Sequence, residues 1–202
     1  ARTCMMAGVG LTGVFLWYLV RFWVYGKAVV LTSAPLTIPA GFLIAGMAVA
    51  TLIGAALASW AAGPISESIE EKNIPVARAV AGACLLYAAG LALAWGLGVW
   101  STGTARENGM LLFALISGFA FGIYDSLGLE LVMDSLPDPR RAGHDLGIYA
   151  LANSAGLALA AIIGALLVNA FEHSFGYYLL FPSAIVMVLL AGIVTLTTKS
   201  AE

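Results

Sequence analysis

The 202-residue chain is too apolar for a soluble domain: 61% of its residues are hydrophobic, 10% are charged, and its mean hydropathy is +0.98. Charged residues make up about 25% of ordinary soluble domains. A formal net charge of −2 gives no sign of the basic surface that nucleic acids require, so we expect no nucleic-acid partner. The composition predicts an integral protein of the lipid bilayer.

The apolar residues form six blocks that predict transmembrane helices. A helix needs roughly 20 residues to cross about 30 Å of hydrocarbon, and the blocks lack the alternation of a membrane barrel strand. We therefore predict an all-α fold, with residues 1–202 forming one polytopic domain of six transmembrane helices. The expected spans are about 5–25, 36–60, 76–100, 109–133, 146–169 and 175–197.

The basic residues of the expected loops predict an orientation. Six spans leave both termini on the same side of the membrane. The loops and termini of that side contain Arg2, Lys72, Arg140, Arg141 and Lys199, with Arg78 at a span edge, whereas the other side has only Lys27 and Arg106. Because basic residues collect in cytoplasmic loops, we expect a cell-membrane protein with both termini in the cytoplasm.

Small residues recur at four-residue spacing in two of the expected spans. These residues are Ala50, Gly54, Ala58 and Ala62 in the second span, and Gly118, Gly122 and Ser126 in the fourth. In lipid, helices associate largely by close backbone approach through small side chains. We therefore predict that both faces are helix contacts. Pro182 removes a backbone donor and is expected to bend the sixth span.

Asp125 is the strongest candidate for a functional residue inside the membrane. It lies four residues, or roughly 5 Å, from the middle of the fourth expected span. A charge near the centre of a spanning helix costs about 2.5–3.5 kcal/mol on insertion scales, so it usually faces a protein interior or water. Two interpretations remain open: a site for a coupling ion or substrate, and a structural carboxylate bonded to a neighbouring helix.

Three further polar residues are candidates for the same site. Glu130 lies about 13 Å from the middle of its span, so we interpret it as an interfacial group. Arg21 lies roughly 8 Å to the outer side of its helix centre, where it can extend to the headgroups. The depths of Arg21 and Asp125 differ by about 13 Å, which argues against an ion pair between them. Asn153 requires either a helix neighbour or a polar ligand.

Motifs of metal and nucleotide enzymes do not occur in the sequence. It has no HExxH run, no GxSxG turn and no phosphate-binding GxxxxGK[ST] loop. His144 and His173 fall in expected loops on opposite sides of the membrane, so they cannot share one metal ion. We therefore predict a protein that is not an enzyme and has no metal or cofactor. Cys4 and Cys84 lie on different spans and are interpreted as packing residues.

Several short motifs lie in the order in which one transporter family carries them. They are "WYLVRF" at 17–22, "GFAFGIYD" at 118–125, "DSLPD" at 134–138, "AGHDLG" at 142–147 and "GYYLLF" at 176–181. In this pattern the chain resembles the carboxyl-terminal half of the major facilitator superfamily, in particular its branch of sugar and cation symporters. His144 replaces the lysine that is usual in that branch.

The segment "AAGPISESIEEKNIP" at 61–75 is the most charged stretch of the sequence. From its residues we expect a short surface helix that ends before Pro75, either in a solvated loop or as a docking element for another membrane domain. The resemblance implies a latch between transporter halves, with the pattern G-x-x-S-D-R-x-G-R-[RK]. Gly63 and Ser66 match this pattern and Glu67 takes the place of its aspartate, whereas its arginines are missing.

The resemblance implies a secondary active transporter that moves a small solute by alternating access, coupled to protons or cations. Such transporters have two six-helix halves and bind solute between them near the midplane, so we expect a second six-helix half or a partner membrane subunit. Asp125 would face the cavity between the halves. The alternative is a transporter-like structural or assembly subunit of a larger membrane complex. The altered latch and the absence of a second half within these residues favour that alternative.

Overall fold

A computed structural model describes residues 1–25, 37–100, 103–134, 142–171 and 173–197. The regular structure of these residues is helical, which confirms the predicted all-α class. The elements are α1 (Arg2–Gly13), α2 (Leu16–Leu19), the π-helix η1 (Val20–Val24), α3 (Thr37–Glu71), α4 (Val76–Trp100), α5 (Thr104–Asp134), α6 (Ala142–Ala170) and α7 (His173–Thr197).

Within the described residues, five helices are long and apolar enough to cross a membrane: α3, α4, α5, α6 and α7. They coincide with the last five predicted spans, and α4 has the predicted bounds of 76–100. Continuous helices of this kind satisfy every backbone polar group within the segment, as a chain in hydrocarbon must. The protein is therefore a multi-pass membrane protein.

The segment predicted as the first span, 5–25, is broken into three short helices. The backbone leaves helical geometry at Phe15, with φ −98° and ψ 8°, before α2 and η1 continue. The Phe15 ring packs against Gly164 of α6, where a side chain would collide with it. This contact holds the chain at the break. Hydrophobicity alone gave no indication of the interruption.

Helix α3 extends beyond its predicted end at residue 60, through Pro64, to Glu71. The short surface helix predicted within 61–75 is therefore not separate but the continuation of α3. One interior proline removes a single backbone hydrogen bond, and alanine and glutamate on either side of it are good helix formers. Asn73, in the left-handed conformation with φ 50°, ends the turn before Pro75, as the sequence predicted.

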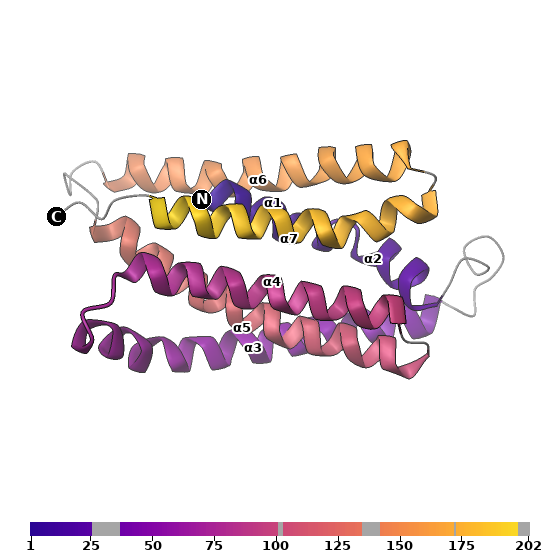
Figure 1. Ribbon diagram of the computed structural model, residues 1–202, viewed down its shortest axis with the longest axis horizontal. Coiled ribbons are helices and arrows are strands. Elements are labelled where there is room, and N and C mark those ends of the chain that lie inside the picture. The colour runs from indigo at the N-terminus through magenta and orange to yellow at the C-terminus, as the bar shows by residue number, and fades with distance from the viewer. Residues whose placement is uncertain (26–36, 101–102, 135–141, 172, 198–202) are drawn as a thin grey trace.

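The helices pack as two groups of three. In one group α1 lies against α6 and α7, and in the other α5 lies against α3 and α4, while contacts between α4 and α7 join the two groups (Figure 1). The two groups have equivalent contacts, with α1 corresponding to α5, α6 to α3, and α7 to α4. Helices α4 and α5 are the most buried of the five long helices, whereas α3 and α6 leave most of their surface exposed.

The glycines of the predicted small-residue faces of α3 and α5 pack directly against the other helix, which confirms the interpretation for Gly54, Gly118 and Gly122, whereas Ser126, assigned to the same face, is exposed. A Cβ atom on Gly118 would collide with the Thr51 carbonyl oxygen. On Gly54 it would collide with the Leu115 carbonyl oxygen, and on Gly122 it would lie 2.6 Å from the Ala58 Cβ atom. Backbone-to-backbone approach of this kind is the main attraction available to helices in lipid.

Candidate functional site

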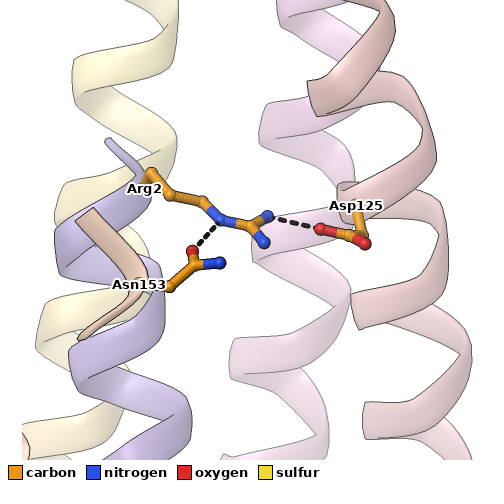
Figure 2. Close-up of polar contacts among 3 residues, drawn as sticks. All are labelled: Arg2, Asp125 and Asn153. Atoms are coloured by element: carbon orange, nitrogen blue, oxygen red, sulfur yellow. Dashed lines mark hydrogen bonds and ion pairs between the residues drawn. The ribbon is translucent and has the colours of Figure 1, made fainter. Parts of the chain in front are cut away.

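Asp125 forms an ion pair with Arg2 across the two helix groups. Its Oδ1 atom lies 2.6 Å from Arg2 Nη1, joining α5 to the first turn of α1 (Figure 2). Because α5 begins at Thr104, Asp125 is six residues, or about 9 Å, from the middle of the helix at residue 119. The Arg2 side chain is only 12% exposed, whereas that of Asp125 is 51% exposed. The carboxylate is paired but not enclosed.

Asn153 of α6 is the second partner of Arg2. The Arg2 Nε atom donates a hydrogen bond of 2.6 Å to Asn153 Oδ1 (Figure 2). The amide that the sequence marked as needing a partner finds one on a neighbouring helix, and the structure brings it to the same group as Asp125. One guanidinium therefore connects α1, α5 and α6.

Three aromatic rings surround the same guanidinium. Arg2 Cζ lies 4.5 Å from the ring centre of Tyr149, 5.6 Å from that of Tyr124 and 5.9 Å from that of Phe121. Such distances allow cation–π attraction. The spacing of these residues explains the arrangement, because positions three and four apart share a helix face. We call this group the Arg2 site: Arg2, Phe121, Tyr124, Asp125, Tyr149 and Asn153.

Two polar atoms of the Arg2 site are not fully satisfied by the part of the chain that the structure describes. Arg2 Nη1 is in contact with Asp125 but makes no hydrogen bond of good geometry, and the buried hydroxyl of Tyr149 has no hydrogen-bond partner. Buried polar groups in native proteins are almost always bonded to protein or to ordered water. These atoms, together with the half-exposed carboxylate, leave the site able to bind water or a polar solute.

The sequence analysis missed Arg2 as a site residue and counted it among the cytoplasmic basic residues. The structure corrects this assignment, because the N-terminal label in Figure 1 lies within the length of the bundle, and Arg2 bonds two spanning helices there. Arg2 lay outside the predicted span, so its depth could not be inferred from hydrophobicity. Lys72, Arg140, Arg141 and Lys199 still outnumber the basic residues of the other side.

Arg21, the other arginine candidate, does not join this group. It lies on η1, with Cζ 5.8 Å from the Trp17 ring centre, and its buried Nε atom has no hydrogen-bond partner among the residues described. Asp125 pairs with Arg2 instead, in keeping with the depth difference that argued against an Arg21 pair.

Glu130 and Ser66, predicted separately, are brought together by the packing of α3 and α5. Ser66 Oγ donates a hydrogen bond of 3.4 Å to Glu130 Oε1. Gly63 has open space around its Cα and Glu67 is exposed, so neither belongs to this contact. The contact connects the segment interpreted as a latch with the same helix that carries Asp125.

Within the described ranges, no group of three or more histidine, cysteine, aspartate or glutamate residues could hold a metal ion. Comparisons of the chain with protein-family models, with curated proteins and with solved structures found no match. The resemblance to the major facilitator superfamily therefore depends on the sequence motifs alone and stays a prediction. The geometry of the Arg2 site is the principal evidence about function.

Proposed function

We propose that the chain is a six-helix half of a secondary active transporter of the major facilitator type. It moves a small solute across the cell membrane, coupled to protons or cations, by alternating access. The observation that carries this proposal is the Asp125 carboxylate, half exposed on a spanning helix and paired with a buried arginine of the other helix group. The role is transport rather than catalysis.

The exposure of Asp125 supports an aqueous environment for the part of its carboxylate that Arg2 does not cover. Hydrocarbon strongly disfavours a charged carboxylate, and intramembrane acids almost always face a bundle interior or a water-filled cavity. Arg2 pairs with one oxygen atom of the Asp125 carboxylate, but about half of the Asp125 side-chain surface remains exposed. We infer that this surface faces an aqueous path between this chain and a second six-helix half, on the same polypeptide or on a partner subunit.

In the proposed half, α3 to α7 form five crossings, and α1, α2 and η1 together form the remaining one, which comes first in the chain. Residues 2–24 would extend roughly 34 Å at 1.5 Å per residue, and because Arg2 lies level with Asp125 inside the bundle, this length continues from that depth to the opposite side of the membrane. With six crossings and the excess of basic residues, the end of α7 and the turn between α3 and α4 lie on the cytoplasmic side, and α1 begins in the half of the bundle nearer that side. Breaks in spanning helices are frequent at transporter binding sites, and π-helical turns often mark functional positions.

The Arg2 site also provides a means of coupling. Protonation of Asp125 removes the negative charge that holds Arg2, and therefore weakens the only ion pair between α1 and α5 that the described residues form. Deprotonation restores the pair. Because α1 and α5 belong to different helix groups, this change alters the attraction between the two groups, which is the kind of bistable contact that alternating access requires.

Transport measurements with Asp125→Asn test the proposal. A panel of sugars, organic cations and carboxylates is added to membrane vesicles that contain the protein, and proton movement is followed with a pH-sensitive dye. We expect one solute class to drive proton movement through the wild-type protein, and Asp125→Asn to abolish it although the variant inserts normally. Ser126→Ala, a neighbouring exposed position on α5, is the matched control and should retain it.

Equal solute-driven proton movement in the wild-type protein and Asp125→Asn would remove Asp125 from the mechanism. One observation favours the alternative function, a structural subunit of a membrane complex: a single arginine of α1 bonds residues of two other helices, as a purely architectural contact would. Co-purification of the chain in fixed ratio with a larger complex, without solute-driven proton movement, would support that alternative.

A further inference from the structure

We propose that the Arg2 site is a receptor for a planar, guanidinium-type cation, and that the Arg2 side chain is its built-in occupant. A solute cation of the same class would take the place of the Arg2 guanidinium against Asp125, Asn153 and the three rings. The inference names the solute class of the transporter and therefore rests on the proposed function. The binding step itself can be measured without transport.

Each contact to the Arg2 guanidinium is one that attracts positive charge. Asp125 and Asn153 each present an oxygen atom at 2.6 Å. Phe121, Tyr124 and Tyr149 present ring faces, which carry the negative part of the aromatic quadrupole. Apart from Arg2 itself, these contacts include no cation, so the surroundings would favour a cation over an anion if the side chain moved away.

The contacts select a flat cation rather than a spherical one. The guanidinium donates to Asn153 from Nε and contacts Asp125 through Nη1, while its central Cζ atom lies 4.5 Å from the centre of the Tyr149 ring. A guanidinium satisfies both requirements because its N–H donors point outward in the plane of a weakly hydrated, delocalised charge. An alkylammonium can also pair with a carboxylate beside a ring, but its compact charge is more strongly hydrated and it lacks a planar set of donors, so it should bind more weakly.

The occupant is held in a way that allows exchange. Half of the Asp125 side chain is exposed, so an incoming cation can reach the carboxylate before Arg2 leaves. The Arg2 Nη1 contact with that carboxylate lacks hydrogen-bond geometry. The unpartnered Tyr149 hydroxyl is a further contact for a cation that bears a polar substituent.

The test is to remove the occupant and supply its head group. The full chain carrying Arg2→Ala is purified in lipid nanodiscs, and its thermal unfolding is followed while methylguanidinium is added. We expect a saturable rise in the unfolding temperature, at least about fivefold larger than in the wild-type protein at the same concentration, because a ligand that binds only the folded state stabilises it. Methylammonium should give a smaller rise.

Three controls define the site. Urea has the shape of guanidinium without its charge, and potassium chloride matches the ionic strength, so neither should stabilise Arg2→Ala. The double variant Arg2→Ala with Asp125→Asn should lose most of the response. If Arg2→Ala does not fold, Arg2→Gln places an amide N–H donor near the position of Arg2 Nε, where it can still bond Asn153, but removes the guanidinium head. This variant should respond in the same order with a smaller amplitude.

No response of either variant to methylguanidinium would overturn the proposal, as would equal responses to urea or equal responses with and without Asp125. Failure to recover folded protein from both variants, even with methylguanidinium present throughout purification, would also overturn it. Binding in Arg2→Ala, together with solute-driven proton movement that Asp125→Asn leaves unchanged, would retain the cation site and reject the transport role. Loss of solute-driven proton movement in Asp125→Asn, without methylguanidinium binding in Arg2→Ala, would retain the transport role and reject the cation site.

Discussion

At the scale of single residues, Arg2 shows how burial and pairing combine. Its long side chain is almost covered, and its charge is balanced by one carboxylate, one amide oxygen and three rings. The sequence indicated Asp125 and Asn153, because carboxylate and amide groups stand out in apolar runs. It could not indicate Arg2 or the rings, since aromatic residues are ordinary in membrane helices and only the packing of α1, α5 and α6 shows which face one another.

The Tyr149 ring and hydroxyl contribute differently, which gives a prediction at this scale. The hydroxyl has no partner among the described residues, so Tyr149→Phe should leave the unfolding free energy nearly unchanged. Tyr149→Leu removes the ring face closest to Arg2 and should lower that free energy by about 0.5–2 kcal/mol. Thermal or denaturant unfolding in nanodiscs checks both variants. Equal destabilisation by the two would show that the hydroxyl, not the ring, holds the site.

At the scale of elements, long apolar blocks predicted five helices well, because length and hydrophobicity are what the bilayer selects. The same signal could not show where α1 ends or that α3 continues through Pro64. Both features depend on contacts between helices or on local backbone energy. The small-residue faces of α3 and α5 were predictable, since four-residue spacing brings small residues onto one face, and the structure places Gly54 and Gly118 directly at their contact.

A pair of substitutions in α3 tests how tightly these faces pack. A Cβ at Gly54 meets backbone atoms of α5, which cannot move aside, whereas a Cβ at Gly41 of the same helix meets nothing within 4 Å. We expect Gly54→Ala to lower the unfolding free energy by about 1–3 kcal/mol. Gly41→Ala should leave it unchanged or raise it, because alanine is the better helix former. Equal effects would show that α3 and α5 are not in close contact.

At the scale of the whole molecule, α4 and α7 join the two helix groups, and the pair of Arg2 with Asp125 adds a polar contact between them. Helices α3 and α6 leave most of their surfaces uncovered, which is compatible with lipid and also with a second half. The sequence predicted a helical membrane protein and a carboxylate within it. It could not predict that the carboxylate would remain half exposed, because exposure depends on how α1 and α5 are placed in space.

If water reaches Asp125 inside the membrane, a thiol at that position should react with a water-soluble reagent. In a background without Cys4 and Cys84, Asp125→Cys is compared with Leu85→Cys. Leu85 is 60% exposed on α4. Gly90 of α4 contacts Ile116 of the antiparallel helix α5. Five residues away on each helix, Leu85 therefore lies about level with residue 121, one helical turn from Asp125.

Both variants are treated in intact membranes with a charged, membrane-impermeant methanethiosulfonate, which reacts only with thiols in water. We expect rapid modification at position 125 and no modification at position 85. A thiol at position 125 that reacts no faster than the one at position 85 would contradict this expectation.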